Sequence, residues 1–221
     1  MSQRILVWDV PTRVFHWLFA LSFTGAYLTA ETERYRDIHV VLGYTLLGLI
    51  TFRLLWGFFG THYAKFRSFW FKPSEIVAYS LSLLKGKPKH YVGHNPAGSV
   101  AIWLLITLGI LSGVTGVILF QDIGGDVLEE LHEVTSNAML AVVFFHIAGV
   151  VVSSLMHREN LVRSMVTGFK SAEPNEGIRR SYRWLGVIML VGVVAFWVDY
   201  PATGLATTSE TVAKVGQHSH G

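Results

Sequence analysis

The sequence predicts an all-α integral membrane protein, in which a bundle of four transmembrane helices is followed by a fifth. Apolar residues make up 51% of the 221-residue chain and charged residues only 15%, whereas soluble domains usually contain about a quarter charged residues. The apolar residues gather in five stretches, most of which reach the roughly 20 residues needed to cross a bilayer core of about 30 Å. These stretches are 14–30, 38–60, 97–120, 134–156 and 182–200.

The first and last stretches are the shortest, and aromatic residues near their ends support membrane insertion. Tryptophan and tyrosine are enriched where a helix meets the membrane surface. Here they are Trp17, Tyr27, Trp184, Trp197 and Tyr200. The first stretch also has features of a cleaved signal peptide, with Arg4 and Arg13 as its basic flank. We interpret it as a retained helix, because its histidine is needed for the site described below.

The charges of the connecting segments predict the orientation of the helices. Segments 31–37 and 121–133 carry more acidic than basic side chains, whereas 61–96 and 157–183 are strongly basic. Because positively charged connections stay in the cytoplasm, we expect the N-terminus and both basic connections there. Five spans then place the C-terminus of this multi-pass protein on the opposite, periplasmic side. This asymmetry also accounts for the net charge of +3, so no nucleic-acid partner is predicted.

Two segments outside the spans have their own expected structures. Within 61–96, Pro73 and Ser74 begin a short helix on the cytoplasmic membrane surface, and Gly86 ends it. The last eight residues, "KVGQHSHG", contain His218 and His220 and are expected to be disordered. We therefore divide the chain into the four-helix bundle, 1–157, and a second part, 158–221. This second part holds a cytoplasmic connection, the fifth transmembrane helix and a short periplasmic tail.

The chain contains no cysteine, and this restricts the cofactors that it can hold. Disulfides, iron–sulfur clusters, thiolate zinc sites and the covalent attachment of c-type haem all require cysteine. Any redox cofactor must therefore be held by histidine or without a covalent bond.

Four histidines lie in the predicted spans, where an ionisable side chain indicates a functional site. His132 and His146 are fourteen residues apart in the fourth span, which on a helix corresponds to about 21 Å of rise and about 40° of rotation. They therefore share one helix face at two depths. His39, at the periplasmic end of the second span, is level with His132. His16, at the cytoplasmic end of the first span, is level with His146.

Two pairs follow from these depths, His39 with His132 and His16 with His146. A b-type haem fits between two imidazoles in an apolar bundle, because its iron takes two axial histidines. Zinc would require four ligands, usually with carboxylate or thiolate help. The sequence thus predicts a haem-binding four-helix bundle with two non-covalent, bis-histidine b-type haems. With both axial positions of each iron occupied, no catalytic residue is predicted.

Other residues are candidates for contacts with these cofactors. Gly43 and Gly149 follow axial histidines by four and three residues and would let a flat macrocycle approach the backbone, although glycines also serve ordinary helix packing. Arg53 is the only charge well inside a span. We expect it to bind a haem propionate or a quinone oxygen, the alternative being a side chain that snorkels to the interface. His94 is expected either to contact the cytoplasmic haem or a quinone, or to belong to a helix-capping turn.

Several short motifs in residues 8–157 resemble the bacterial cytochrome b561 family, in its nickel–iron hydrogenase b-type cytochrome and formate dehydrogenase gamma-like branch. The motifs are "RVFHW" at 13–17, "IHVVLG" at 38–43, "RLLWG" at 53–57, "GHNPAG" at 93–98, "LHE" at 131–133 and "FFHIAG" at 144–149. The resemblance implies a four-helix bundle with two b haems, held by His16, His39, His132 and His146. It also implies electron transfer between a periplasmic redox partner and the membrane quinone pool. The fifth span lies outside the shared bundle.

We therefore expect an electron-transfer subunit of a respiratory oxidoreductase rather than an independent enzyme. The acidic segment 121–133 is a candidate docking site for a periplasmic cytochrome c or a hydrogenase-like subunit. One alternative is a stand-alone quinone-linked oxidoreductase such as a superoxide oxidase, and a more distant one is a histidine-lined metal transporter. The sequence also leaves a homodimer open.

Overall fold

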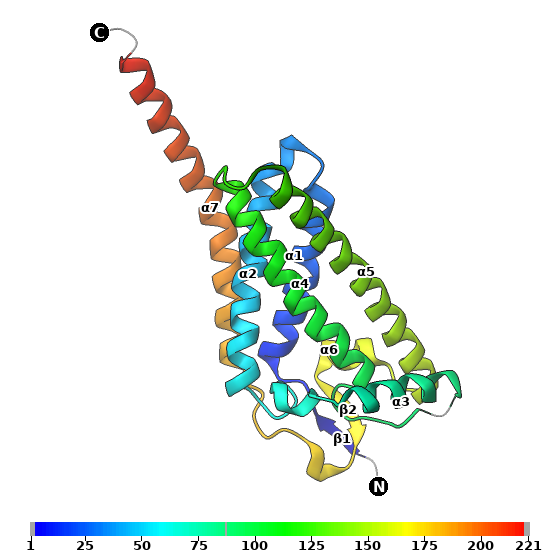
Figure 1. The fold of residues 1–221 in the computed structure, drawn as a ribbon. Coiled ribbons are helices and arrows are strands. Elements are labelled where there is room, and N and C mark those ends of the chain that lie inside the picture. Colours follow the sequence, from blue (N-terminus) through cyan, green and yellow to red (C-terminus); the bar gives the residue numbers. More distant parts are fainter. Residues whose placement is uncertain (1–2, 87, 219–221) are drawn as a thin grey trace.

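Five long helices run side by side in the computed structural model, which describes residues 3–86 and 88–218, with side chains as far as Tyr200 (Figure 1). They are α1 (Val10–Thr29), α2 (Arg36–Phe59), α4 (Pro96–Phe120), α5 (Gly125–His157) and α7 (Arg183–His218). Helix α1 packs against α2 and α7, whereas α5 packs mainly against α4, and α2 contacts α4. The bundle therefore has α7 at one edge and α5 at the other.

The connections between the helices gather at two ends of opposite charge (Figure 1). The basic end contains the N-terminal residues and the segments 60–95 and 158–182. It includes the short helices α3 (Pro73–Leu84) and α6 (Leu161–Thr167). The acidic end contains residues 30–35 and 121–133, with the 3-10 helix η1 (Glu33–Tyr35). The two basic connections thus lie together with the N-terminus, as the alternation of five spans requires.

Four helical segments in the described part of the chain are long and apolar enough to cross a membrane. They are Glu33–Phe59, Pro96–Phe120, Gly125–His157 and Arg183–Tyr200. Helix α1 has 20 residues and lies alongside them but does not reach the mean hydropathy of these four segments. Its sequence includes Arg13, His16 and Ser22, and Ser22 is completely buried in the bundle. The lower hydropathy of α1 thus has a structural reason, because polar groups of this helix face the protein interior rather than lipid.

Local sequence signals set the starts of several helices. The Asp9 side chain accepts a hydrogen bond from the Thr12 amide at 2.8 Å, which caps α1. Asn95 caps α4 in the same way, with 2.7 Å between its Oδ1 atom and the Gly98 amide. Pro73 lies in the first turn of α3, as predicted. That helix ends just before Gly86, whose φ of +69° favours glycine.

Two predictions about secondary structure were wrong. The acidic segment 121–133 is a turn only as far as Gly124, after which Asp126, Glu129, Glu130 and Glu133 belong to α5. The predicted tail is helical as far as His218, because α7 continues beyond the bundle, while His220 lies outside the described residues. Two short strands also form a small sheet, which the apolar pattern of the sequence did not reveal.

That sheet joins the N-terminus to the connection before α7. Strand β1 (Gln3–Leu6) pairs antiparallel with β2 (Phe169–Ala172), with Gln3 opposite Ala172 and Leu6 opposite Phe169. The 3-10 helix η3 (Pro174–Glu176) follows β2. Ile5, Val7, Trp8 and Ala172 form a buried cluster beneath this sheet. A second cluster lies closer to the bundle, around Phe66 and Phe69 of η2 (Phe66–Phe69). The basic end is therefore a folded cap with its own apolar core.

Candidate haem sites

Two imidazoles meet near the acidic end of the bundle. His39, from the first turn of α2, faces His132 of α5 with 6.2 Å between the ring centroids and 75° between the ring planes. The Nδ1 atom of His39 lies 2.8 Å from the Ala26 carbonyl oxygen. The Nδ1 atom of His132 lies 2.9 Å from the Ser112 carbonyl oxygen. Because a carbonyl can only accept, Nδ1 of each ring carries the proton, and Nε2 of each is left to bind a metal.

A second pair lies near the basic end. His16 of α1 faces His146 of α5, with 6.4 Å between the ring centroids and 53° between the ring planes. Nδ1 of His16 is buried and has no hydrogen-bond partner among the described residues. A buried polar atom without a partner is uncommon in folded proteins and requires an explanation. Both pairs are the ones that the helix geometry predicted.

The separation of the rings within each pair fits an iron ion held from both sides. Two metal–nitrogen bonds of about 2 Å each would place the centroids of facing imidazoles roughly 6 Å apart. The observed 6.2 and 6.4 Å agree with this arrangement. In the described part of the chain, no group of three or more His, Asp or Glu side chains could hold a metal ion. The histidines therefore come in twos, which suits haem iron better than a four-ligand zinc ion.

The glycines near these pairs fall into two groups. A Cβ atom added to Gly43 or Gly149 would meet no heavy atom within 4 Å, so a flat group has room beside the backbone at both positions. At Gly25, in contrast, an added Cβ would lie 2.7 Å from the Leu42 side chain. Gly25 thus serves the packing of α1 against α2.

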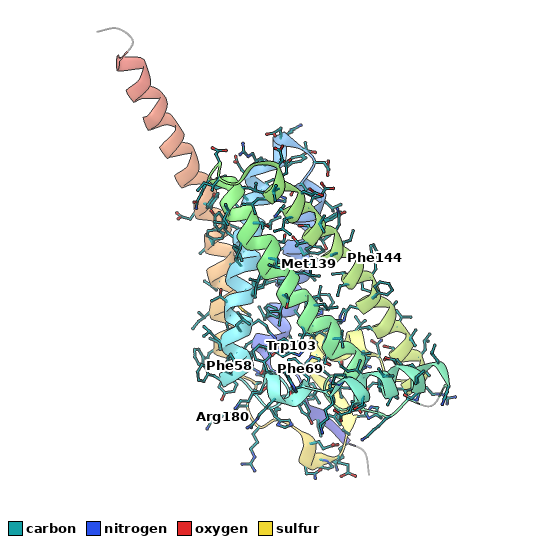
Figure 2. The ribbon with its side chains drawn as sticks, in the orientation of Figure 1. Phe58, Phe69, Trp103, Met139, Phe144 and Arg180 are labelled. Carbon is teal, nitrogen blue, oxygen red and sulfur yellow. The ribbon has the colours of Figure 1, made fainter. Side chains whose placement is uncertain are left out.

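Arg53 points into the basic end of the bundle. The residue is only 4% exposed, and its Nη1 atom donates a hydrogen bond to the Ala64 carbonyl oxygen at 3.0 Å. Its guanidinium carbon lies 5.1 Å from the centroid of the Phe66 ring and 5.5 Å from that of Phe69, within the range of cation–π attraction. The side chain therefore does not reach solvent as a snorkelling arginine would. Figure 2 shows Phe69 and Trp103 in the same region.

His94 lies between two aromatic rings beside Arg53. Its ring centroid is 4.7 Å from that of Trp8 and 4.8 Å from that of Phe69. Burial, together with the charges of Arg53 and His146, lowers the pKa of His94 to about 3. The ring is therefore neutral at physiological pH. The capping role in this turn belongs to Asn95, and His94 is instead a packed side chain next to the basic-end pair.

Comparison with known proteins agrees with this geometry. A family model described as prokaryotic cytochrome b561 matches residues 7–168. This range contains both histidine pairs. The chain belongs to the prokaryotic cytochrome b561 family. The family resemblance and the all-α membrane fold inferred from the sequence are thus confirmed. As a b-type cytochrome, this cytochrome b561 binds haem b and takes part in membrane electron transfer.

Three bacterial relatives show how far the similarity extends. All are named as probable Ni/Fe-hydrogenase B-type cytochrome subunits. The protein from Rhizobium leguminosarum bv. viciae is 26% identical, over 77% of this chain and 92% of its own length. Those from Azotobacter vinelandii and Rhodobacter capsulatus are 25% and 26% identical, over 76% of this chain and 89% and 81% of their own lengths. No solved structure matches the chain.

The structure adds residues around His132 that the sequence did not single out. Thr115 lies with its hydroxyl oxygen 3.2 Å from Nδ1 of His132. A Cβ atom on Gly116 would lie 3.0 Å from the same ring, so glycine leaves the space that His132 occupies. Ser112, Thr115 and Gly116 lie on one face of α4, within the sequence "SGVTG" at 112–116. Small residues at this spacing are typical of a helix face that packs closely against a neighbouring helix.

Met139 is a further residue that the sequence did not single out. It lies seven residues from both His132 and His146, on the inward face of α5, and is 2% exposed (Figure 2). The two histidine pairs are therefore separated along α5 by an apolar layer. Phe144, in contrast, is 63% exposed and points outward from α5, where lipid is expected.

Proposed function

We propose that this cytochrome carries electrons across the membrane through two b-type haems, with His39 and His132 as the axial ligands of one and His16 and His146 as those of the other. The observation that carries this proposal is that the two imidazole rings of each pair lie with their centroids about 6 Å apart. Helix α5 provides one histidine to each pair. A bis-histidine haem accepts and releases one electron without binding a further ligand at iron. The two sites lie at opposite depths, so electrons can pass from one end of the bundle to the other.

The protein residues fix the imidazoles in a ligand-binding orientation. The hydrogen bonds of His39 to Ala26 and of His132 to Ser112 hold both rings at the acidic end in one tautomer. Such bonds also raise the basicity of the ligating nitrogen. At the basic end, His94 lies beside Arg53 and within electrostatic reach of His16 and His146, and the buried guanidinium of Arg53 can bind a haem propionate or a quinone oxygen. We therefore propose that exchange with the quinone pool takes place at the basic end.

The acidic end is the proposed docking site for the redox partner. Asp126, Glu129, Glu130 and Glu133 are exposed on the first turns of α5, beside the His39–His132 pair. The named relatives are hydrogenase cytochrome subunits, which favours a periplasmic hydrogenase-like subunit over a cytochrome c. In this arrangement the basic end and the N-terminus face the cytoplasm of a bacterial inner membrane, and the C-terminus faces the periplasm.

Haem stoichiometry and reduction kinetics test the proposal. The purified protein should contain two b haems per polypeptide, and His146→Ala or His132→Ala should each reduce this number to one. His62→Ala is the matched control, because His62 is an exposed histidine outside the spans. A single haem in the unaltered protein would refute the two-site proposal. Reduction by a hydrogenase-like partner should slow as salt is added, whereas quinone reactivity without any partner would point instead to a stand-alone oxidoreductase.

A further inference from the structure

The seam between α2 and α7 has a polar cavity at its basic end. The cavity has a volume of about 610 Å³ and lies where α2 has just ended and α7 is about to begin. Its lining residues come from two segments, with Thr61, His62 and Tyr63 on one side and Arg179, Arg180 and Tyr182 on the other. This cavity thus lies outside the histidine pairs, at the level where a bilayer has its headgroups.

The charge of this cavity suits an anion. Neither Arg179 nor Arg180 makes an ion pair among the described side chains. The one carboxylate in the lining, that of Glu176, accepts a hydrogen bond from the Glu173 amide at 3.1 Å and so caps its own short helix. Two arginines, together with hydroxyl and imidazole groups, match the oxygen atoms of a phosphate.

The same seam continues into the membrane as an apolar groove. This groove has a volume of about 560 Å³ and is lined by Gly48, Phe52 and neighbouring residues of α2, and by Met189, Gly192 and Phe196 of α7. Added Cβ atoms at Gly48 and Gly192 would meet nothing within 4 Å, so both walls leave open space. Thr45, which also lines the groove, accepts a 2.8 Å hydrogen bond from the Trp197 indole, and this bond joins α2 to α7.

The distance between cavity and groove matches a membrane lipid. Tyr182 and Met189 are seven residues apart, which corresponds to about 10 Å along α7, and Gly192 lies about 15 Å from Tyr182 on the same measure. One leaflet of the hydrocarbon core is also about 15 Å deep. Aromatic rings connect the two: Trp56 stacks on Phe52 of the groove with 5.9 Å between ring centroids, and lies 5.3 Å from the ring of Tyr182, which lines the cavity.

We infer that the α2–α7 seam binds one anionic phospholipid, with its phosphate headgroup on Arg179 and Arg180 and an acyl chain in the groove at Gly48 and Gly192. A transmembrane helix of a partner or a second copy of this chain would fill the apolar groove but leave the two arginines without an anion. A free phosphate ion would occupy the cavity but not the groove. Only a diacyl lipid with a negative headgroup uses both features.

Native mass spectrometry of the full-length protein in detergent tests this inference. We expect one bound phosphatidylglycerol or cardiolipin molecule per polypeptide, with an affinity that falls about 30-fold in the R179A/R180A variant, because each arginine near a membrane surface contributes about fivefold. The charge-matched control is K85A/K89A, whose side chains are exposed at the opposite edge of the basic end. Gly192→Leu should fill the groove and also displace the lipid.

Haem absorbance of every variant reports whether the fold is intact, and only variants with an unchanged spectrum are compared. Equal binding of phosphatidylcholine would overturn the role of the arginines, and equal stabilisation by inorganic phosphate alone would reduce the site to a free-anion site. Unchanged lipid retention in R179A/R180A would also contradict the inference. So would a Gly192→Cys variant that forms a crosslink with a partner helix or with a second copy of the chain.

Discussion

Replacing Asp9 is predicted to destabilise the protein more than replacing any exposed acidic residue. Asp9 is completely buried. Its carboxylate accepts hydrogen bonds from the Thr12 amide at 2.8 Å, the Trp56 indole at 3.1 Å and the Thr61 hydroxyl at 2.6 Å. It thus ties the start of α1 to the end of α2 and to the connection that follows.

The size of the effect follows from the donors that lose their acceptor. In Asp9→Ala two buried donors and the partly buried Thr61 hydroxyl lose a charged acceptor, and each unsatisfied buried group costs about 1–3 kcal/mol. Because part of this cost is relieved by water and by rearrangement of the Thr61 hydroxyl, we expect a net loss of roughly 3–5 kcal/mol. For a chain of this length that corresponds to a fall in Tm of roughly 10 °C. Asp9→Asn should lie between this variant and the unaltered protein, since the amide can keep one acceptor oxygen.

Thermal unfolding, followed by haem absorbance and tryptophan fluorescence, measures this loss. Asp126→Ala is the control, because Asp126 is exposed on α5 at the other end of the bundle. A change in Tm of less than about 2 °C for Asp9→Ala, or a change equal to that of the control, would show that this hydrogen-bonded network does not stabilise the basic end.

Three further predictions concern the haem sites and their surroundings. Gly116→Leu should displace the ring of His132 and leave one haem per polypeptide, so two retained haems would contradict the close contact. Glu129→Lys with Glu130→Lys should slow reduction by a periplasmic partner about tenfold at low ionic strength and have little effect at high salt; a salt-independent rate would exclude docking at the acidic end. His94→Gln should reduce the loss of stability on acidification. The pKa of His94 in the folded protein is about 3, below its ordinary value of 6.5, so the unfolded chain binds this proton more tightly. The stability from neutral His94 is therefore complete above pH 6.5 and is lost as the pH falls towards 3, and an unchanged pH profile in the variant would refute this.

The histidine pairs could be predicted because they depend on helix geometry alone. The fourteen-residue spacing of His132 and His146 fixes their common face, and the alternation of the spans fixes the level of His39 and His16. The hydrogen bonds that orient the rings were out of reach, since a backbone carbonyl such as that of Ser112 leaves no trace in the amino-acid type. Gly116 was missed because glycines are frequent in membrane helices and only the contact with His132 distinguishes it.

The errors in the fold have a different origin. The start of α5 was placed too late, because its first turns are acidic and lack the apolar periodicity from which the spans were identified. The pairing of β1 with β2 joins residues about 165 positions apart, and four-residue strands carry too little pattern to reveal such a partner. The position of His94 between Trp8 and Phe69 likewise depends on three segments that meet only in the folded cap.

The small sheet also sets an order of events during biosynthesis. Its first strand leaves the ribosome almost at once, whereas its second strand is made only after α5 and α6. His16 is likewise synthesised early, and its partner His146 is added only much later. A nascent chain thus has to keep its first helix inserted without either contact until about three quarters of the protein has been synthesised. The haem proposed for the basic end would therefore be captured only late in translation or after it.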